Sequence, residues 1–150
     1  MHTIAKEMGV KMRSSKPILL IEDDRLDAMM VARALDELKV TNELVHKTNG
    51  KEALDYLTDE ANKKPCFILL DLNMPKTNGV DFLRIAKADE ALKRVPIVVL
   101  TSSTEEQDVI ETFKLSVAGY IVKPMDYVKF VEAIRTLALY WTLSELPNGE

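Results

Sequence analysis

Four short apolar runs of this chain each end at side chains that could do chemistry. The runs read ILLI, FILL, PIVVL and GYIV, and the polar residues that follow them are, in order, Glu22 and Asp23, Asp71, Thr101, and Lys123. Such uninterrupted runs are typical of buried parallel strands, whose carboxyl ends face the ligand crevice of an open α/β sheet. We therefore expect these five side chains to meet at one edge of a sheet.

The residue types at these run ends suit phosphoryl transfer. Glu22, Asp23 and Asp71 offer carboxylate oxygens, and like charges this close either raise each other's pKa or are held by a cation. Oxygen ligands with room for waters and phosphate oxygens favour Mg²⁺. Lys123 would add an ammonium group and Thr101 a hydroxyl donor, which a phosphoryl group in transfer requires. Asp71 could be the attacking group, because aspartate forms acyl-phosphate intermediates.

Other polar residues near these runs have simpler interpretations. Asp24 follows the acidic pair, and we expect it to cap the next helix rather than to belong to the site. A transition-metal site lacks ligands, because the chain has two histidines. His2 stands in the N-terminal segment and His46 within a predicted strand, and we interpret both as solvated surface residues.

The runs that must position these residues alternate with helical patterns. Strand-like runs are predicted at 18–22, 43–47, 66–71, 96–100 and 119–122, and helices at about 25–38, 50–60, 79–88, 104–115 and 126–142. Five β-α units in strict alternation predict the α/β class, with a doubly wound, five-stranded parallel sheet and helices on both faces.

Two of the predicted helices carry apolar stripes that should face the sheet. The stripe of the first helix repeats every four residues and consists of Leu26, Met30, Ala34 and Leu38. The stripe of the last helix consists of Val128, Val131, Leu137 and Trp141, and its apolar face is widened by Phe130, Ile134 and Tyr140. The widening has two interpretations: further contact with the neighbouring helix and the sheet, or a surface for self-association.

Length and composition predict one domain. A chain of 150 residues with 47% hydrophobic content has material for one well-buried core. We expect a flexible leader over residues 1–16, a single domain over 17–143 with an extended last helix, and a polar tail over 144–150.

Charge and cysteine content exclude several classes of partner. A net charge of −4, without a basic stripe along a helix, argues against nucleic-acid binding. Charges interrupt every apolar run, so none is long enough to span a membrane, and the first residues lack the apolar centre of a signal peptide. The one cysteine, Cys66, is interpreted as a small core residue. These features predict a protein of the reducing cytosol.

The pattern of these residues resembles the receiver domain of two-component response regulators, the family that contains the chemotaxis protein CheY. The resemblance spans about residues 16–140. Its motifs are the pair Glu22-Asp23, the segment D-x-x-M-P-x-x-x-G from Asp71 to Gly79, Thr101 after an apolar run, and YIVKP from Tyr120 to Pro124. The resemblance implies the flavodoxin-like (βα)5 receiver fold.

The resemblance also implies a role for each site residue. Asp71 would accept a phosphoryl group from a sensor histidine kinase. Asp23, Asp71 and the backbone carbonyl of Asn73 would ligate Mg²⁺, and Glu22, which replaces a more frequent aspartate, would hold a metal-bound water. Lys123 would pair with the phosphoryl group, and Thr101 would donate a hydrogen bond to it. Tyr120 would be the switch aromatic of the family, and the peptide bond before Pro124 would be cis.

Three further segments resemble the stand-alone regulators that partner phytochrome histidine kinases. They are LKRVP at 92–96, LTSS at 100–103 and YWTL at 140–143. The resemblance implies a phytochrome kinase as donor and a homodimer formed through the last helix and the aromatic C-terminal segment. It also implies output through a downstream protein or a phosphotransfer protein.

The primary hypothesis is therefore a phosphoacceptor switch rather than an enzyme with turnover. A phosphorelay intermediate for another kinase is an alternative. A phosphohydrolase with an aspartyl-phosphate intermediate is a further one, but it requires a second aspartate two residues after Asp71, where this chain has Asn73. A docking module that has lost its chemistry is the last alternative, and the complete set of site residues argues against it.

Overall fold

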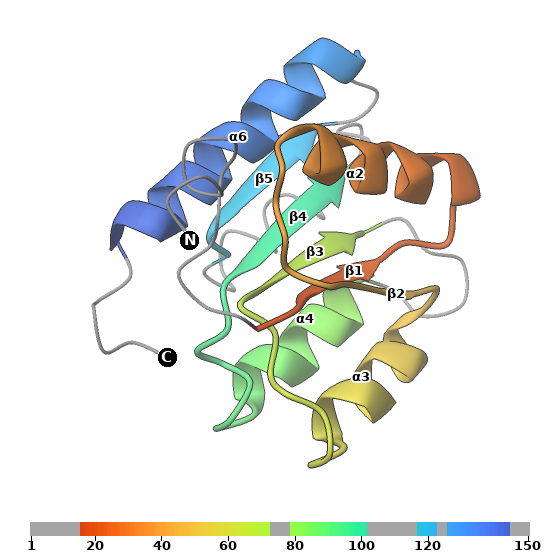
Figure 1. Cartoon of the computed structure of the whole chain (residues 1–150). Helices are drawn as coiled ribbons and strands as arrows, with labels where there is room; N and C mark the ends of the chain where they lie inside the picture. Colours follow the sequence, from red (N-terminus) through yellow and green to blue (C-terminus); the bar gives the residue numbers. More distant parts are fainter. Residues whose placement is uncertain (1–15, 73–78, 102–116, 123–125, 145–150) are drawn as a thin grey trace.

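The computed structural model describes residues 16–72, 79–101, 117–122 and 126–144, which hold the strands and helices labelled in Figure 1. Side chains at positions 101, 120 and 138–144 lie outside this description. In chain order, the elements are β1 (Ile18–Ile21), α2 (Arg25–Glu37), β2 (Leu44–Lys47), α3 (Gly50–Thr58), β3 (Phe67–Asp71), α4 (Gly79–Ala88), β4 (Ile97–Thr101), β5 (Gly119–Val122) and α6 (Tyr127–Ser144).

The strands form one parallel sheet in the order β2-β1-β3-β4-β5. Helices α2 and α6 lie on one face, and α3 and α4 lie on the other (Figure 1). The predicted doubly wound α/β fold is confirmed. The helix predicted at 104–115 lies outside the described residues.

The core is divided into two layers by the sheet. Successive strand residues point to opposite faces, so Phe67 and Leu69 of β3 pack with α2 and α6, while Ile68 and Leu70 pack with α3 and α4. Every residue of β1 and β3 is buried. This double burial explains why the strands read as uninterrupted apolar runs.

The stripe predicted for α2 is partly wrong. Its buried residues are Ala28, Val31, Ala34 and Leu35, and Leu38 is buried at its end. Leu26 is 75% exposed, although it was expected to face the core. A repeat of four advances about 40° around a helix at each step, so a series of four such residues turns away from the sheet at one end. The true stripe alternates steps of three and four.

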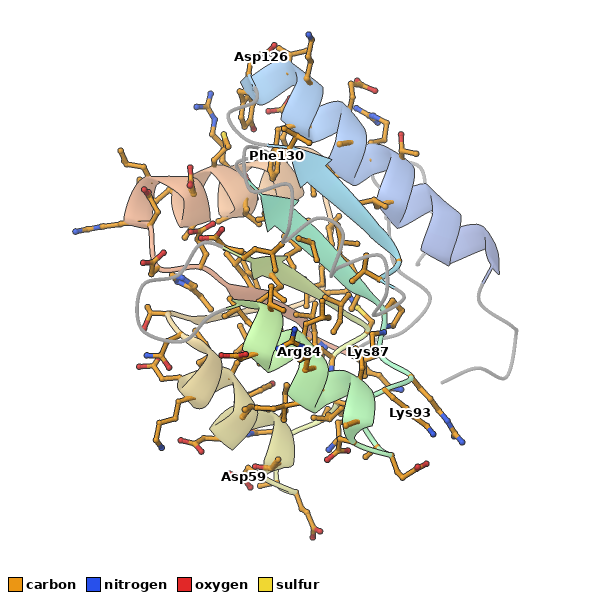
Figure 2. The ribbon with its side chains drawn as sticks, turned by 180° about the vertical axis from the view of Figure 1, so that it is seen from behind. Asp59, Arg84, Lys87, Lys93, Asp126 and Phe130 are labelled. Carbon is orange, nitrogen blue, oxygen red and sulfur yellow. The ribbon has the colours of Figure 1, made fainter. Side chains whose placement is uncertain are left out.

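The stripe predicted for α6 needs a similar correction. Phe130, Val131 and Ile134 are buried, whereas Val128 is 70% exposed. Figure 2 shows Phe130 on the side of α6 that faces the rest of the domain, and it belongs to the core layer that includes α2. Phe130 and Ile134 therefore fill the core of the single chain. The side chains of Tyr140 and Trp141 lie outside the described residues.

Polar contacts join the start of α6 to α2. The Tyr127 hydroxyl donates a hydrogen bond to Glu37 Oε1 at 2.8 Å, and the Arg33 guanidinium lies 4.6 Å from the centre of the Tyr127 ring. Asp126, which directly precedes α6 and is labelled in Figure 2, accepts a hydrogen bond from the Lys129 backbone N–H at 2.9 Å. These contacts fix where α6 begins, four residues after Lys123 in the sequence.

No helix in the described part of the chain combines the length and the apolar character that crossing a membrane would require.

Candidate functional site

The parallel register brings the ends of four strands to one edge of the sheet. Ile21 pairs with Leu70, so Glu22 follows β1 at the level where Asp71 ends β3. Asp71 pairs with Leu100, and Thr101 pairs with Val122 at the end of β5. The backbone positions of the predicted site residues on β1, β3 and β4 therefore lie side by side.

Three carboxylates meet at this edge. Glu22, Asp23 and Asp71 each offer an oxygen, and these oxygens lie within 4.8 Å of one another. Glu22 is 0% and Asp71 2% exposed, whereas Asp23 is exposed. The cluster thus has a buried floor and one open side. It is the only group of three or more His, Cys, Asp or Glu residues with this geometry in the described part of the chain.

The turn that carries Glu22 and Asp23 is held by hydrogen bonds on several sides. The Glu22 N–H donates to the Lys47 carbonyl at 3.0 Å, continuing the ladder between β1 and β2. Glu22 Oε2 accepts the Asp24 N–H at 3.1 Å. Asp24 Oδ1 accepts the Asp27 N–H at 3.0 Å, so the prediction that Asp24 caps α2 is confirmed.

His46 is a residue whose contact the sequence did not reveal. Its side chain is exposed, as predicted, but its Nε2 lies 2.7 Å from the backbone oxygen of Glu22. The prediction that His46 is a surface residue is therefore confirmed, and the structure adds a hydrogen bond to it. The alternation along β2 gave a weak signal, because it places His46 in register with Leu20, two residues before Glu22.

Several predicted site residues lie outside the described residues. They are Asn73, Lys123 and Pro124. Thr101 and Tyr120 are described only in their backbone, and Tyr120 pairs with Val99. The roles expected of these five residues stay predictions. Gly79, the last residue of the segment that begins at Asp71, starts α4 directly against the backbone of Asp71 and Leu72.

The oxygen donors fit a hard divalent cation. A cluster of three carboxylates supplies oxygens only, and the exposed side of Asp23 leaves space for waters or phosphate oxygens, which is the coordination that Mg²⁺ prefers. The chemistry of the donor set thus agrees with an acidic metal pocket.

Comparison with known proteins assigns the family. Residues 18–135 match the family described as the response regulator receiver domain. The chain belongs to this family. Receiver domains of response regulators are signalling switches that bind a divalent metal at an acidic pocket and partner histidine kinases.

This receiver domain is similar to three response regulators. Response regulator Rcp1 of Synechocystis sp. is 35% identical over 130 residues, which cover 84% of this chain and 88% of Rcp1. A crystal structure of Rcp1 in its Mn²⁺-bound form has a TM-score of 0.77 at 34% identity, and the match covers 86% of this chain and 96% of that one.

The other two are solved structures of phytochrome response regulators. Phosphorylated cyanobacterial RcpA has a TM-score of 0.78 at 36% identity, covering 89% of this receiver domain and 97% of RcpA. The bacteriophytochrome response regulator RtBRR has a TM-score of 0.71 at 42% identity, covering 89% of this receiver domain and 85% of RtBRR.

Proposed function

We propose that Asp71 of this receiver domain accepts a phosphoryl group from a sensor histidine kinase, and that the aspartyl phosphate switches a protein-interaction surface. The observation that carries the proposal is the group of Glu22, Asp23 and Asp71, with oxygens within 4.8 Å of one another at adjacent strand ends. The phosphorylated structure of RcpA, 36% identical to this chain, supports a phosphoacceptor role.

The proposed step exchanges one bond to phosphorus for another. A carboxylate oxygen of Asp71 attacks the phosphorus of a phosphohistidine, the P–N bond breaks, and its electron pair returns to the imidazole. Asp71 is 2% exposed, so the reacting oxygen is shielded from most of the solvent. The phosphoryl group passes from the histidine of the kinase to Asp71, and no turnover of a small substrate is required.

Three carboxylates and one backbone group would hold Mg²⁺ at this site. Asp23, Asp71 and the Asn73 carbonyl would ligate it directly, and Glu22 would do so through a water. When bound, Mg²⁺ would neutralise charge on the transferring oxygens. The Mn²⁺-bound form of Rcp1 supports a divalent ion in a relative.

Two further side chains complete the proposed transfer site. Lys123, directly after β5, would pair with the phosphoryl group, and Thr101, at the end of β4, would donate a hydrogen bond to it. Movement of Thr101 toward the phosphoryl group would let Tyr120 turn inward and change the outer surface. A cis peptide before Pro124 would set the direction of the chain after Lys123.

We propose a phytochrome histidine kinase as the donor. RcpA and RtBRR are phytochrome response regulators, and they match this chain at 36% and 42% identity over most of its length. The proposed location is the cytosol, the proposed domain spans 17–143, and the proposed output is contact with a downstream protein or onward phosphotransfer.

We also propose a homodimer formed through α6 and the C-terminal segment. Val128, in the first turn of α6, is 70% exposed, although it is apolar, and this supports an outer face for contact between copies. Light scattering of the wild type should give twice the mass of one chain, and Val128→Glu should lower the measured mass toward that of a single chain. Lys129→Glu, an exposed neighbour, is the matched control. A monomer in the wild type, with and without phosphorylation, would contradict the dimer.

The acceptor is tested by phosphotransfer from labelled histidine kinases, phytochrome kinases among them, to three forms of this protein. Wild type and Asp55→Asn should acquire a label that acid, base and hydroxylamine release, as expected of an acyl phosphate, whereas Asp71→Asn should acquire none. Asp55 is a suitable control because its side chain on α3 is 71% exposed. Label retained on Asp71→Asn would overturn the assignment of the acceptor. Preference for a kinase that is not a phytochrome would overturn the donor.

A further inference from the structure

The geometry points to His46 as a positioning residue of the phosphoryl-transfer site, an inference that rests on the proposed function. His46 Nε2 lies 2.7 Å from the backbone oxygen of Glu22. Because a carbonyl oxygen can only accept, the ring nitrogen must carry the hydrogen and donate it. A side chain from the edge strand β2 therefore binds the backbone of the turn that supplies Glu22 and Asp23, two of the three clustered carboxylates.

The bonded carbonyl belongs to the peptide that joins Glu22 to Asp23. A peptide unit is planar, so a hydrogen bond to its oxygen also fixes the direction in which the chain enters Asp23. The N–H of Glu22 is already bound to the Lys47 carbonyl at 3.0 Å. With both backbone groups of Glu22 bonded to β2, the turn cannot rotate freely between β1 and α2. The Asp23 carboxylate is thereby presented toward Asp71.

A side chain takes this role because the ladder between the two strands ends here. The last register pair of β1 and β2 is Ile21 with Lys47. In this parallel register, the backbone N–H that would continue the ladder to the Glu22 carbonyl is that of Asn49, which lies beyond β2 as the N-cap of α3. The Thr48 N–H donates to Glu52 Oε1 at 3.0 Å as the chain turns into α3. His46 reaches past the end of the ladder and supplies a donor to the first carbonyl beyond β1.

The consequence concerns the metal rather than the acceptor. Asp23 is the exposed member of the cluster, whereas Glu22 and Asp71 are held by burial. Its orientation therefore depends most on the backbone that carries it. Groups that orient metal ligands typically change metal affinity by about 10- to 100-fold when they are removed. Loss of the His46 hydrogen bond should thus weaken Mg²⁺ and Mn²⁺ binding and leave the chemistry of Asp71 at saturating metal intact.

Three substitutions of His46 distinguish the effect of its hydrogen-bond donor from the effect of the shape of its ring. His46→Leu removes the donor. His46→Gln keeps an amide N–H at nearly the distance of Nε2 from the backbone, and His46→Asn offers the same group one methylene shorter. We expect the dissociation constant for Mn²⁺, measured by calorimetry on the unphosphorylated protein, to rise about tenfold in the Leu and Asn variants. The Gln variant should stay within about twofold of the wild type, as should Glu43→Gln, an exposed control before the same strand.

A second readout tests positioning against a general loss of structure. In phosphotransfer, the Leu and Asn variants should need about tenfold more Mg²⁺ for half-maximal rate and should reach the wild-type rate when Mg²⁺ saturates. The Gln and Asn variants suffice if His46→Leu fails to fold. Unchanged Mn²⁺ binding in His46→Leu or His46→Asn, or an equal loss in His46→Gln, would overturn the inference while the wild type still binds metal and accepts phosphoryl. A wild type that does neither would overturn the proposed function, and the inference with it.

Discussion

Gly79, the first residue of α4, lies so close to Leu72 that a Cβ on Gly79 would stand 2.6 Å from the Leu72 Cα. The same Cβ would stand 2.8 Å from the backbone oxygen of Asp71. Neither neighbour is the flexible end of a side chain. A glycine here therefore lets α4 begin against the end of β3, directly beside the proposed phosphoacceptor.

Gly79→Ala should push α4 away from β3. The forced movement should cost about 1–3 kcal/mol of unfolding free energy, as overpacking does elsewhere, and should slow phosphotransfer to Asp71 because its backbone moves. Urea unfolding and the phosphotransfer rate measure the two effects. Gly119→Ala is the matched control, since a Cβ at Gly119 meets nothing within 4 Å. Equal stability of the two variants would contradict this explanation.

Lys39 ends α2 in a backbone conformation that favours glycine. Its φ is 62°, its N–H donates to the Asp36 carbonyl, and the Val40 N–H donates to the Leu35 carbonyl, both at 3.0 Å. This is the Schellman pattern, in which a left-handed residue closes the helix. Lys39→Gly should gain roughly 0.5–1 kcal/mol in unfolding free energy, the relief of strain less the added freedom of the unfolded chain.

The control for Lys39→Gly is Lys51→Gly, in the first turn of α3. Glycine inside a helix costs about 1 kcal/mol, so the two substitutions should move the urea midpoint in opposite directions. Phosphotransfer should be unchanged in Lys39→Gly, because the residue lies at the far end of α2 from Glu22 and Asp23. A loss of stability in Lys39→Gly would show that its side chain matters more than its backbone.

Tyr127 should ionise at a higher pH than a free tyrosine. Partial burial raises the pKa of the Tyr127 phenol, and the hydrogen bond to Glu37 and the charge of that carboxylate raise it further. A group whose pKa is raised in the folded state adds stability below its unfolded pKa and loses that contribution as the pH rises through the folded value. The stability of the wild type should therefore fall toward that of Tyr127→Phe above about pH 10.

Absorbance near 295 nm follows tyrosine ionisation, and the difference between wild type and Tyr127→Phe isolates this residue. Glu37→Gln keeps an acceptor but removes the charge, so it should lower the midpoint of Tyr127 without removing the bond. A Tyr127 midpoint at or below that of a free tyrosine would contradict the role of the Glu37 contact between α2 and α6.

The sequence predicted the sheet well because burial on both faces leaves a plain signal. β5 has the predicted bounds, and the bounds of β1, β2, β3 and β4 differ by one residue at most. Helix faces were harder. Leu26 and Val128 are exposed, since an apolar residue near a helix end satisfies the periodicity whether or not the sheet reaches it. Only the position of the helix on the sheet decides whether such a residue is buried.

The site shows the same division. Parallel topology alone brings strand ends together, so the meeting of Glu22, Asp23 and Asp71 could be expected from two apolar runs. The contact of His46 with the Glu22 carbonyl could not, because it depends on where the ladder between β1 and β2 stops. The roles of Asn73, Thr101, Tyr120, Lys123 and Pro124 were inferred from family motifs and stay predictions.

Magnesium should stabilise the folded protein through Asp23. A ligand that binds the folded state alone adds about 2.7 kcal/mol at a concentration one hundred times its dissociation constant. Thermal unfolding of the wild type should therefore shift upward with Mg²⁺ and return when the metal is chelated. Asp23→Asn should lose most of this shift because it removes one of three clustered carboxylates, whereas Asp27→Asn, in the first turn of α2, should keep it. An Mg²⁺ shift of equal size in Asp23→Asn would place the metal elsewhere.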